Sequence, residues 1–336
     1  QVEVLLEGAP AGGVTDQQRW IVQQLSQAGA RVSYLRSRPE LDIADRYSYQ
    51  HAKFLLLDER LALVGSENLS PDAFPDDAKA DGTLGRRGLY FVTDAPSVVA
   101  RLAAIFAADS DTAHRDVWPW DAQDTQLGAP PADFQPDYLT GGISYPVRFP
   151  ASLLLHDTLT FQVVQAPENA LAERDGWLAL VNRAGAGEVI LLEALDEPPF
   201  WGASDSTPTQ DPNPRLEAYI NATRRGATVR VLLDAFFDNQ DLDNPRSNLR
   251  TIEYVKAIAQ AEGLDLDARR GNPTGRGIHN KMLLARVAGE GWVMAGSLNG
   301  GETSSKLNRE VSLLVRSAAA YDYLAALFWS DWHGAS

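Results

Sequence analysis

Apolar and polar positions follow two periods along this chain, the period of about two typical of strands and the period of about 3.6 typical of helices. Aliphatic runs at residues 2–8 and 229–235 predict strands. Apolar side chains recur every three or four positions at residues 17–28 and 249–262, which predicts helices. In both places a strand is followed by a helix, and this order favours an α/β architecture in which helices pack on sheets.

The order of these elements occurs twice. Further pairs of segments correspond: HAKFLLLD at 51–58 with HNKMLLAR at 279–286, LVGSENLS at 63–70 with MAGSLNGG at 294–301, and RRGLYFVTD at 86–94 with NREVSLLVR at 308–316. Repetition in the same order predicts an internal duplication. We expect two repeated halves, each a mixed, mostly parallel sheet flanked by helices, packed about a pseudo-twofold axis with one shared active site.

The duplication also predicts the domain boundaries. We expect a first half at residues 1–116, a proline-rich connection at 117–155 and a second half at 156–336. The second half has additional predicted strands and helices before residue 229, whereas the first half begins at the counterpart of that residue. If the halves were once equal, roughly 70 residues would precede Gln1.

Composition narrows the classes of function. The chain has 45 Asp+Glu against 30 Lys+Arg, a formal net charge of −15, which disfavours a protein that grips a long polyanion. It has no cysteine, which excludes disulfides, thiolate nucleophiles and cysteine-ligated metals. No apolar run reaches the roughly 18 uncharged residues of a membrane span. We therefore expect a soluble or peripheral protein, and the sequence leaves its compartment open, an extracytoplasmic one included.

Histidine, lysine, serine and asparagine recur at matching positions of the two halves. The repeated set is His51, Lys53, Ser66 and Asn68 in the first half, and His279, Lys281, Ser297 and Asn299 in the second. Residues i and i+2 of a strand face the same side, so each histidine should point with its lysine. Such a set suits a phosphodiester, because one imidazole can attack phosphorus, the other can protonate the leaving alkoxide, and the cations and amides can neutralise the oxygens.

This double pattern resembles the signature of the phospholipase D superfamily, HxKx4D followed by GSxN, and the similarity covers nearly the whole chain. The resemblance implies a phosphodiester exchange through a phosphohistidine, with no metal or other cofactor. It makes His51 and His279 the nucleophile and the general acid/base, with the two lysines and two asparagines holding the phosphate and the two serines shaping the pocket. It also implies that Glu310 orients a catalytic histidine by a hydrogen bond.

The two halves differ in their carboxylates. Asp58 of the first motif corresponds to Arg286, and Glu310 of the second half corresponds to Gly88. Each half thus keeps one of two carboxylates, and we predict a catalytic role for both Asp58 and Glu310 in an asymmetric pair. By analogy with two-motif relatives, His51 is predicted to be the nucleophile and His279 the acid. A degenerate second copy is the alternative.

Three functions stay open at this point. The first is a phosphodiesterase that hydrolyses or transfers the phosphatidyl groups of phospholipids, and the second is an endonuclease that uses the same double-histidine site. The third is a non-catalytic phosphate-binding module. The expected partner is a phospholipid or other small phosphodiester, with peripheral membrane contact; nucleic acid is less favoured, and no oligomer is required. Aromatic residues in or beside loops, Trp201, Phe236 and Phe237, either form a rim for acyl chains or pack structurally.

Overall fold

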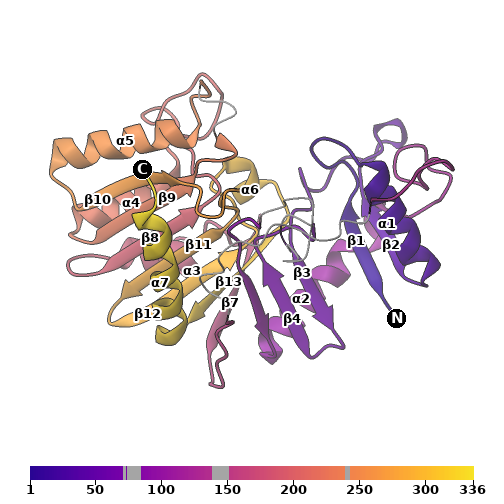
Figure 1. Cartoon of the computed structure of the whole chain (residues 1–336), viewed down its shortest axis with the longest axis horizontal. Helices are drawn as coiled ribbons and strands as arrows, with labels where there is room; N and C mark the ends of the chain where they lie inside the picture. The colour runs from indigo at the N-terminus through magenta and orange to yellow at the C-terminus, as the bar shows by residue number, and fades with distance from the viewer. Residues whose placement is uncertain (71–72, 74–84, 138–150, 239–242) are drawn as a thin grey trace.

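The computed structural model of the chain describes residues 1–70, 73, 85–137, 151–238 and 243–336. The second half is built on a seven-stranded sheet of order β10-β9-β8-β11-β12-β13-β7 (Figure 1). Its strands are β7 (Thr160–Ala166), β8 (Val189–Ala194), β9 (Thr228–Asp234), β10 (Leu266–Gly271), β11 (Lys281–Val287), β12 (Glu290–Gly296) and β13 (Glu310–Arg316). All of them except β10, whose sequence is LDARRG, fall on runs rich in apolar residues.

This sheet is mixed, as predicted, but the expected predominance of parallel pairs was wrong. Strands β10, β9 and β8 are parallel, whereas β8, β11, β12, β13 and β7 pair antiparallel. The reason lies in the connection between β11 and β12, which consists of Ala288 and Gly289, both with positive φ. Two such residues form a tight hairpin, and a hairpin makes antiparallel neighbours.

Helices cover both faces of the seven-stranded sheet. They are α3 (Gly176–Arg183), α4 (Pro214–Arg224), α5 (Asn248–Glu262) and α7 (Ala318–His333), with a short α6 (Glu302–Lys306). Leu283 of β11 packs in one core with Trp177 and Tyr219 of α3 and α4, while its neighbour Leu284 packs in another with Phe328 of α7. Because side chains alternate along a strand, α7 lies on the face opposite α3 and α4.

The first half contains two smaller sheets where one was predicted. The first consists of β1 (Glu3–Glu7), β2 (Arg31–Leu35) and β6 (Val117–Pro119), and the second of β3 (Phe54–Leu57), β4 (Leu61–Gly65) and β5 (Tyr90–Thr93). In the second half β8 lies between β9 and β11 and pairs with both. The described part of the first half has no counterpart of β8, so no strand joins β1 to β3.

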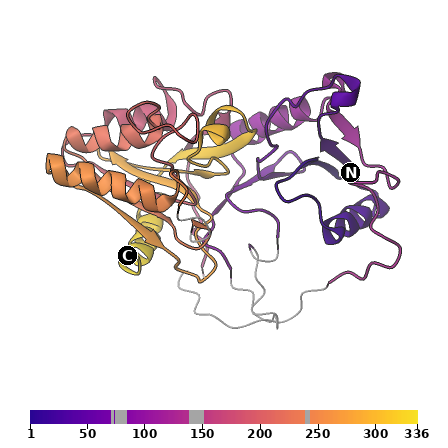
Figure 2. The same cartoon turned by 90° about the horizontal axis from the view of Figure 1, so that it is seen from above.

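Two helices and one strand of the connection complete the first half, which lies beside the second in Figure 2. Helix α1 (Asp16–Gln27) begins after Thr15, whose side chain forms a capping box with Gln18. Helix α2 (Pro96–Asp109) packs with β4 and β7. Strand β6 lies in the predicted connection and pairs antiparallel with β2, so the connection begins as part of the first half.

The halves exchange backbone hydrogen bonds next to the two motif histidines. The N–H of His51 donates to the carbonyl of Arg309 at 3.0 Å, and the N–H of His279 donates to the carbonyl of Arg87 at 2.8 Å. A shared core lies beneath, where Val311 of β13 packs with Val64 of β4. Each half therefore fixes the histidine segment of the other, while the pseudo-twofold axis itself stays a prediction.

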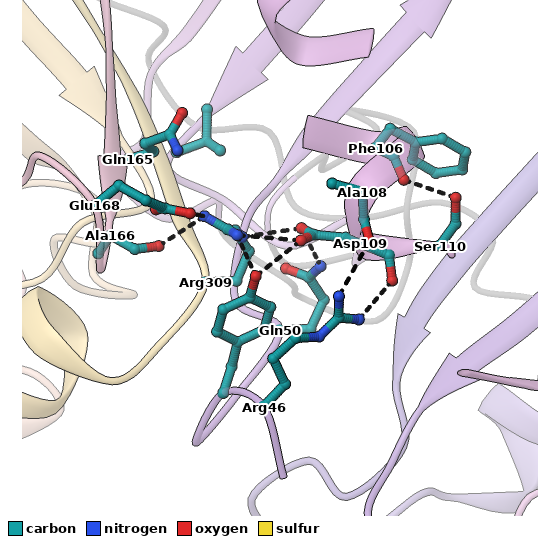
Figure 3. Close-up of polar contacts among 12 residues, drawn as sticks. Arg46, Gln50, Phe106, Ala108, Asp109, Ser110, Gln165, Ala166, Glu168 and Arg309 are labelled. Carbon is teal, nitrogen blue, oxygen red and sulfur yellow. Dashed lines mark hydrogen bonds and ion pairs between the residues drawn. The ribbon is translucent and has the colours of Figure 1, made fainter. Parts of the chain in front are cut away.

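A buried ion pair network also joins the halves (Figure 3). The guanidinium of Arg309, the residue before β13, donates from Nη2 to Asp109 Oδ1 of α2 at 3.1 Å, and it lies 2.7 Å from Glu168 Oε2. It also contacts the hydroxyl of Tyr47. Asp109 is 1% exposed, so its charge depends on this partner for compensation.

Replacing Arg309 with methionine is expected to lower the free energy of unfolding by about 3–5 kcal/mol, because it leaves the buried Asp109 carboxylate without its main counter-charge. The matched control is Arg316→Met at the other end of β13, where the pair with Glu290 is roughly half exposed. This control should cost under about 1 kcal/mol. Urea unfolding followed by tryptophan fluorescence measures both, and equal costs would contradict the prediction.

Candidate active site

The sequence predicted the two motif histidines within strands, and this was wrong, because both lie just before a strand. Strand β3 begins at Phe54 and β11 begins at Lys281. The physical reason is that each histidine N–H bonds to the other half and not to a neighbour in its own sheet. The strand entrances therefore converge on one site at the junction of the halves.

The His51 imidazole is held by a buried carboxylate. Its Nδ1 lies 2.8 and 3.0 Å from the two carboxylate oxygens of Glu310, the first residue of β13. The hydroxyl of Ser304 and the side-chain amide of Asn308 also donate to this carboxylate, at 2.6 and 3.0 Å. Burial alone raises the pKa of Glu310, but the charges of His51 and Lys53 outweigh it and hold the pKa below its usual value. An ionised acceptor at Nδ1 places the ring proton there and leaves Nε2 as the free base.

Both motif lysines donate to the carbonyl oxygen of the histidine two residues earlier. The distance is 2.6 Å from Lys53 Nζ to His51 and 2.8 Å from Lys281 Nζ to His279. Lys281 also donates to the carbonyl of Ser66, in the other half, at 3.3 Å. Removal from water lowers the pKa of Lys53 to about 8. It lowers the pKa of Lys281 to about 7, and the charge of Lys53 adds to this effect.

The His279 imidazole packs more deeply than that of His51, with 10% of its side chain exposed against 27%. Its Nδ1 lies 3.0 Å from the carbonyl oxygen of Ser66 and 3.1 Å from Lys281 Nζ. Burial and, after it, the charge of Lys281 hold the pKa of His279 well below its usual range. An anionic phosphodiester between these cations would raise that pKa again.

Two cavities of different character meet at this cluster. The smaller, about 450 Å³, is lined by His279 together with polar and charged side chains, among them Arg86, Arg246 and Asn248. The larger, about 1280 Å³, is lined by His51 and Lys53 and by many aliphatic side chains. The aliphatic set includes Val4, Leu6, Val14, Ile21, Leu25 and Leu55. Asp196, Asn244, Arg246 and Asn299 line both cavities, so the cavities adjoin, with His279 in the wall of the smaller and His51 in the wall of the larger.

Of the four predicted phosphate-pocket residues, the asparagines line the cavities and the serines do not. Asn68 lines the larger cavity and Asn299 lines both. The hydroxyl of Ser66 accepts from the N–H of Leu89 at 3.0 Å, and that of Ser297 accepts from the N–H of Val311 at 2.9 Å. Both serines are buried, and the hydrogen bond that each hydroxyl accepts holds its loop against the neighbouring segment.

Comparison with known proteins agrees with this arrangement. A family model described as a cardiolipin synthase, PLD-like domain, matches residues 206–332. The fold resembles phosphatidylserine synthase from Haemophilus influenzae Rd KW20, with a TM-score of 0.57 and 12% identity over 97% of this chain and 72% of the other. Residues 206–332 of this chain are thus similar to a phospholipase D-like domain.

Other structural neighbours have lower TM-scores. Polyphosphate kinase from Porphyromonas gingivalis has a TM-score of 0.51 and 12% identity over 98% of this chain and 38% of the kinase. Nuc, a phospholipase D family member from Salmonella typhimurium, has a TM-score of 0.38 and 16% identity over 53% of this chain and 97% of Nuc. No curated protein matches the chain by sequence.

The aspartate of the superfamily signature does not join the cluster. Asp58 lies in the exposed turn between β3 and β4, with a φ of 51°, and lines neither cavity. Four strand residues of about 3.3 Å each separate this turn from the entrance where Lys53 lies. Its counterpart Arg286 is also exposed. The prediction of a catalytic role for Asp58 therefore finds no support in the geometry.

Asp196 belongs to the cluster but was missed in the sequence. It follows β8, and its pKa is raised by burial, against which the charges of Lys281 and His51 act. Its Oδ1 accepts from the N–H of Gly300 at 3.4 Å. The signal was present, because carboxyl ends of parallel strands are a common place for sites and Asp196 directly follows a predicted strand.

Among the residues that the structure describes, no group of three or more His, Asp or Glu side chains is arranged to hold a metal ion. Within the same residues, no helix has the length and apolar character needed to cross a bilayer.

The lysines predict how the activity depends on pH. An ammonium ion binds phosphate and its neutral form does not, so kcat/KM should fall as the pH rises through the pKa values of Lys281 and Lys53, about 7 and about 8. Lys53→Arg should move this alkaline limb to higher pH, since a guanidinium stays charged. The control is Lys256→Met, an exposed lysine on α5. A profile on a soluble chromogenic phosphodiester that is unchanged by Lys53→Arg would refute the assignment.

Proposed function

We propose that this chain is a phosphodiesterase of the phospholipase D type that hydrolyses or transfers the phosphatidyl group of phospholipids through a phosphohistidine. The observation that carries the proposal is that two adjoining cavities are lined by the two histidines, and that aliphatic side chains gather in the larger one. The aliphatic part of the larger cavity suits the acyl chains, and the smaller cavity, lined mostly by polar and charged side chains, suits the head group. The phosphodiester would then lie between them, within reach of both lysines.

The positions of the two histidines suggest the first step, because His51 lines the larger cavity and His279 lines the smaller one. Nε2 of His51 attacks phosphorus from the side of the aliphatic cavity, and a phosphorus–nitrogen bond forms. The bond from phosphorus to the head-group oxygen breaks on the opposite side, where His279 donates a proton to the leaving alkoxide. Glu310 then faces a positively charged phosphoimidazole ring, which its ionised carboxylate stabilises. Lys53 and Lys281 neutralise the charge that builds on the non-bridging oxygens.

The second step reverses these roles. His279, now neutral, removes a proton from water or from an acceptor alcohol, and the oxygen attacks phosphorus. The phosphorus–nitrogen bond breaks and His51 returns to its starting state. Hydrolysis and phosphatidyl transfer differ only in this acceptor. The charge balance is restored because the proton lost in the first step is regained in the second.

The relatives support a phospholipid over a nucleic acid. The family model is described as that of a cardiolipin synthase, and the neighbour covering most of both chains is a phosphatidylserine synthase. The net charge of −15 also disfavours a long polyanion, because tracking one needs a basic groove. The arginines of the smaller cavity, Arg86 and Arg246, instead offer a local site for a polar head group.

A pair of assays tests the substrate class. The native protein and His51→Asn are incubated with vesicles that carry radiolabelled phosphatidylglycerol or phosphatidylserine, and in parallel with single-stranded DNA at several salt concentrations. We expect release or exchange of the head group by the native protein and not by His51→Asn. DNA nicking without lipid turnover would overturn the lipid proposal in favour of a nuclease, and binding without turnover of either would favour a phosphate-binding module.

A matched pair of variants tests the role of the aliphatic cavity. Leu55 and Leu57 lie on the same face of β3 and are similarly exposed, at 43% and 50%, but only Leu55 lines the cavity. Leu55→Asp should reduce turnover of vesicle lipid by roughly tenfold while sparing a soluble chromogenic phosphodiester, since a carboxylate at the cavity wall disfavours an acyl chain. Leu57→Asp should change neither. Equal losses on both substrates would speak against acyl binding there.

A further inference from the structure

The halves differ at one position that the mechanism makes important. The loop after β4 and the loop after β12 make the same contacts, because Ser66 N–H donates to Leu89 O at 3.0 Å and Ser297 N–H donates to Val311 O at 2.9 Å. The residue before Val311 is Glu310, which holds His51, and the residue before Leu89 is Gly88. His279 therefore lacks a carboxylate from the position that serves His51.

A different side chain occupies the space next to Gly88. A Cβ atom built on Gly88 would lie 2.3 Å from Cγ and 2.6 Å from Oε1 of Glu67, distances that no real structure tolerates. Glu67 therefore fills the volume that a side chain at position 88 would need. It is the variable residue of the GSEN segment, and its counterpart in GSLN is Leu298, which is buried in the apolar core.

The Glu67 carboxylate contacts His279 where Glu310 contacts His51. Its Oε2 lies 3.1 Å from His279 Nδ1 and 3.1 Å from Arg86 Nη2, and the residue is 1% exposed. Arg86 is the counterpart of Asn308, whose side chain donates to Glu310 at 3.0 Å. In both halves a buried carboxylate thus contacts a histidine Nδ1 on one side and a nitrogen-bearing side chain on the other. This side chain is Arg86 for Glu67 and Asn308 for Glu310.

We propose that Glu67 is the positioning residue of His279, supplying from the GSEN loop the carboxylate that the second half supplies from β13. The proposal rests on the proposed function in assigning a catalytic consequence. The Glu67 carboxylate and the Ser66 carbonyl are two acceptors at 3.1 and 3.0 Å from Nδ1 of His279, and they favour a ring proton on that nitrogen against the Lys281 ammonium 3.1 Å away. Nε2 is then the free base of a ring that lines the smaller cavity. The Glu67 carboxylate also stabilises the imidazolium that must form when His279 takes up a proton.

The test replaces residues of the first half with those found at the equivalent positions of the second half. Glu67→Leu installs the residue found in the second half and removes the carboxylate at similar size. It should reduce kcat roughly 10- to 100-fold with a smaller change in KM, because a partner that orients a reactive histidine is lost. Gly88→Glu in the Glu67→Ala background, where the Cγ atom that blocks position 88 is gone, places a carboxylate at the position equivalent to Glu310 and should restore at least tenfold of the activity that Glu67→Ala loses. Gly88→Glu alone should be poorly tolerated, because Glu67 occupies its space.

A second readout does not depend on turnover. The chain has five histidines, so the ring nitrogens of His279 can be assigned by ¹⁵N NMR through comparison with His279→Asn. We expect the Nδ1 resonance to shift in Glu67→Leu and to return towards the native value in the double variant. Leu298→Ala, at the equivalent position of the other half, should leave it unchanged. Thermal unfolding confirms that each variant is folded.

These outcomes separate the two proposals. If Glu67→Leu leaves both the Nδ1 resonance and kcat unchanged, Glu67 does not position His279, whatever the chain hydrolyses. If the Nδ1 resonance responds and recovers as expected but the native protein turns over no phosphodiester, the positioning contact stands and the proposed function fails. A loss of activity that Gly88→Glu does not restore, with an unchanged resonance, assigns Glu67 a purely structural role and overturns the inference.

Discussion

Replacing His51 with asparagine is expected to reduce turnover of a soluble phosphodiester by about 10⁴-fold or more, because the proposed covalent intermediate then has no nucleophile. Asparagine retains a polar side chain of similar reach but cannot form a phosphoimidazole. The Glu310 carboxylate would meanwhile keep its hydrogen bonds from Ser304 and Asn308, so the variant should remain folded. Steady-state release of a chromophore measures the loss.

The same variant identifies the nucleophile directly. Protein mixed with a phosphorus-labelled substrate and denatured at high pH should retain label on the peptide that contains His51, and His51→Asn should retain none. His156→Asn is the control, since His156 is exposed and lies outside both cavities. Label on the peptide containing His279 would reverse the roles that we assign to the two histidines.

Much of the fold could be predicted because its local signals agree with one another. Helix α5 was predicted at residues 249–262 and spans Asn248–Glu262, where the hydroxyl of Ser247 caps its start and Gly263 adopts a left-handed conformation at its end. The order of strands and helices in each half likewise followed from periodicity. Pairing between strands was harder to predict, because it depends on which neighbours are present, and without a counterpart of β8 the first half forms two sheets.

Some residues of the candidate site could be predicted from the sequence and others could not. His51, Lys53, His279 and Lys281 stand out because they repeat at fixed spacing, and the structure brings them together at the junction of the halves. Glu67 does not stand out, since it occupies the variable position of its motif. The one signal in the sequence was Gly88 at the position equivalent to Glu310, which indicates that a carboxylate for His279 would have to come from another position. A repeat reveals what the two halves share and conceals how one half compensates for a residue that it lacks.

Replacing His279 with asparagine is expected to have an effect that depends on the leaving group. For a phospholipid, whose alkoxide needs a proton to depart, loss of the general acid should lower turnover by about 10²–10⁴-fold. For a nitrophenyl phosphodiester, whose anion departs without a proton, attack by His51 should survive. The second step still lacks the base that activates water, so one equivalent of nitrophenolate should appear per protein and the reaction should then stall.

The burst distinguishes this mechanism from one in which His279 only binds phosphate. Loss of a binding group would raise KM for both substrates and leave no stoichiometric burst, whereas loss of the acid and base leaves the phosphohistidine trapped.

Adding Glu67→Leu to His279→Asn should cause little further loss of activity, because a positioning residue has no effect once the histidine that it positions is gone. Additive losses would instead mean that Glu67 acts on the site by another route. The electrostatic neighbours for such a route are Lys53 and Lys281, because the Glu67 charge raises the pKa of each against the larger effect of burial.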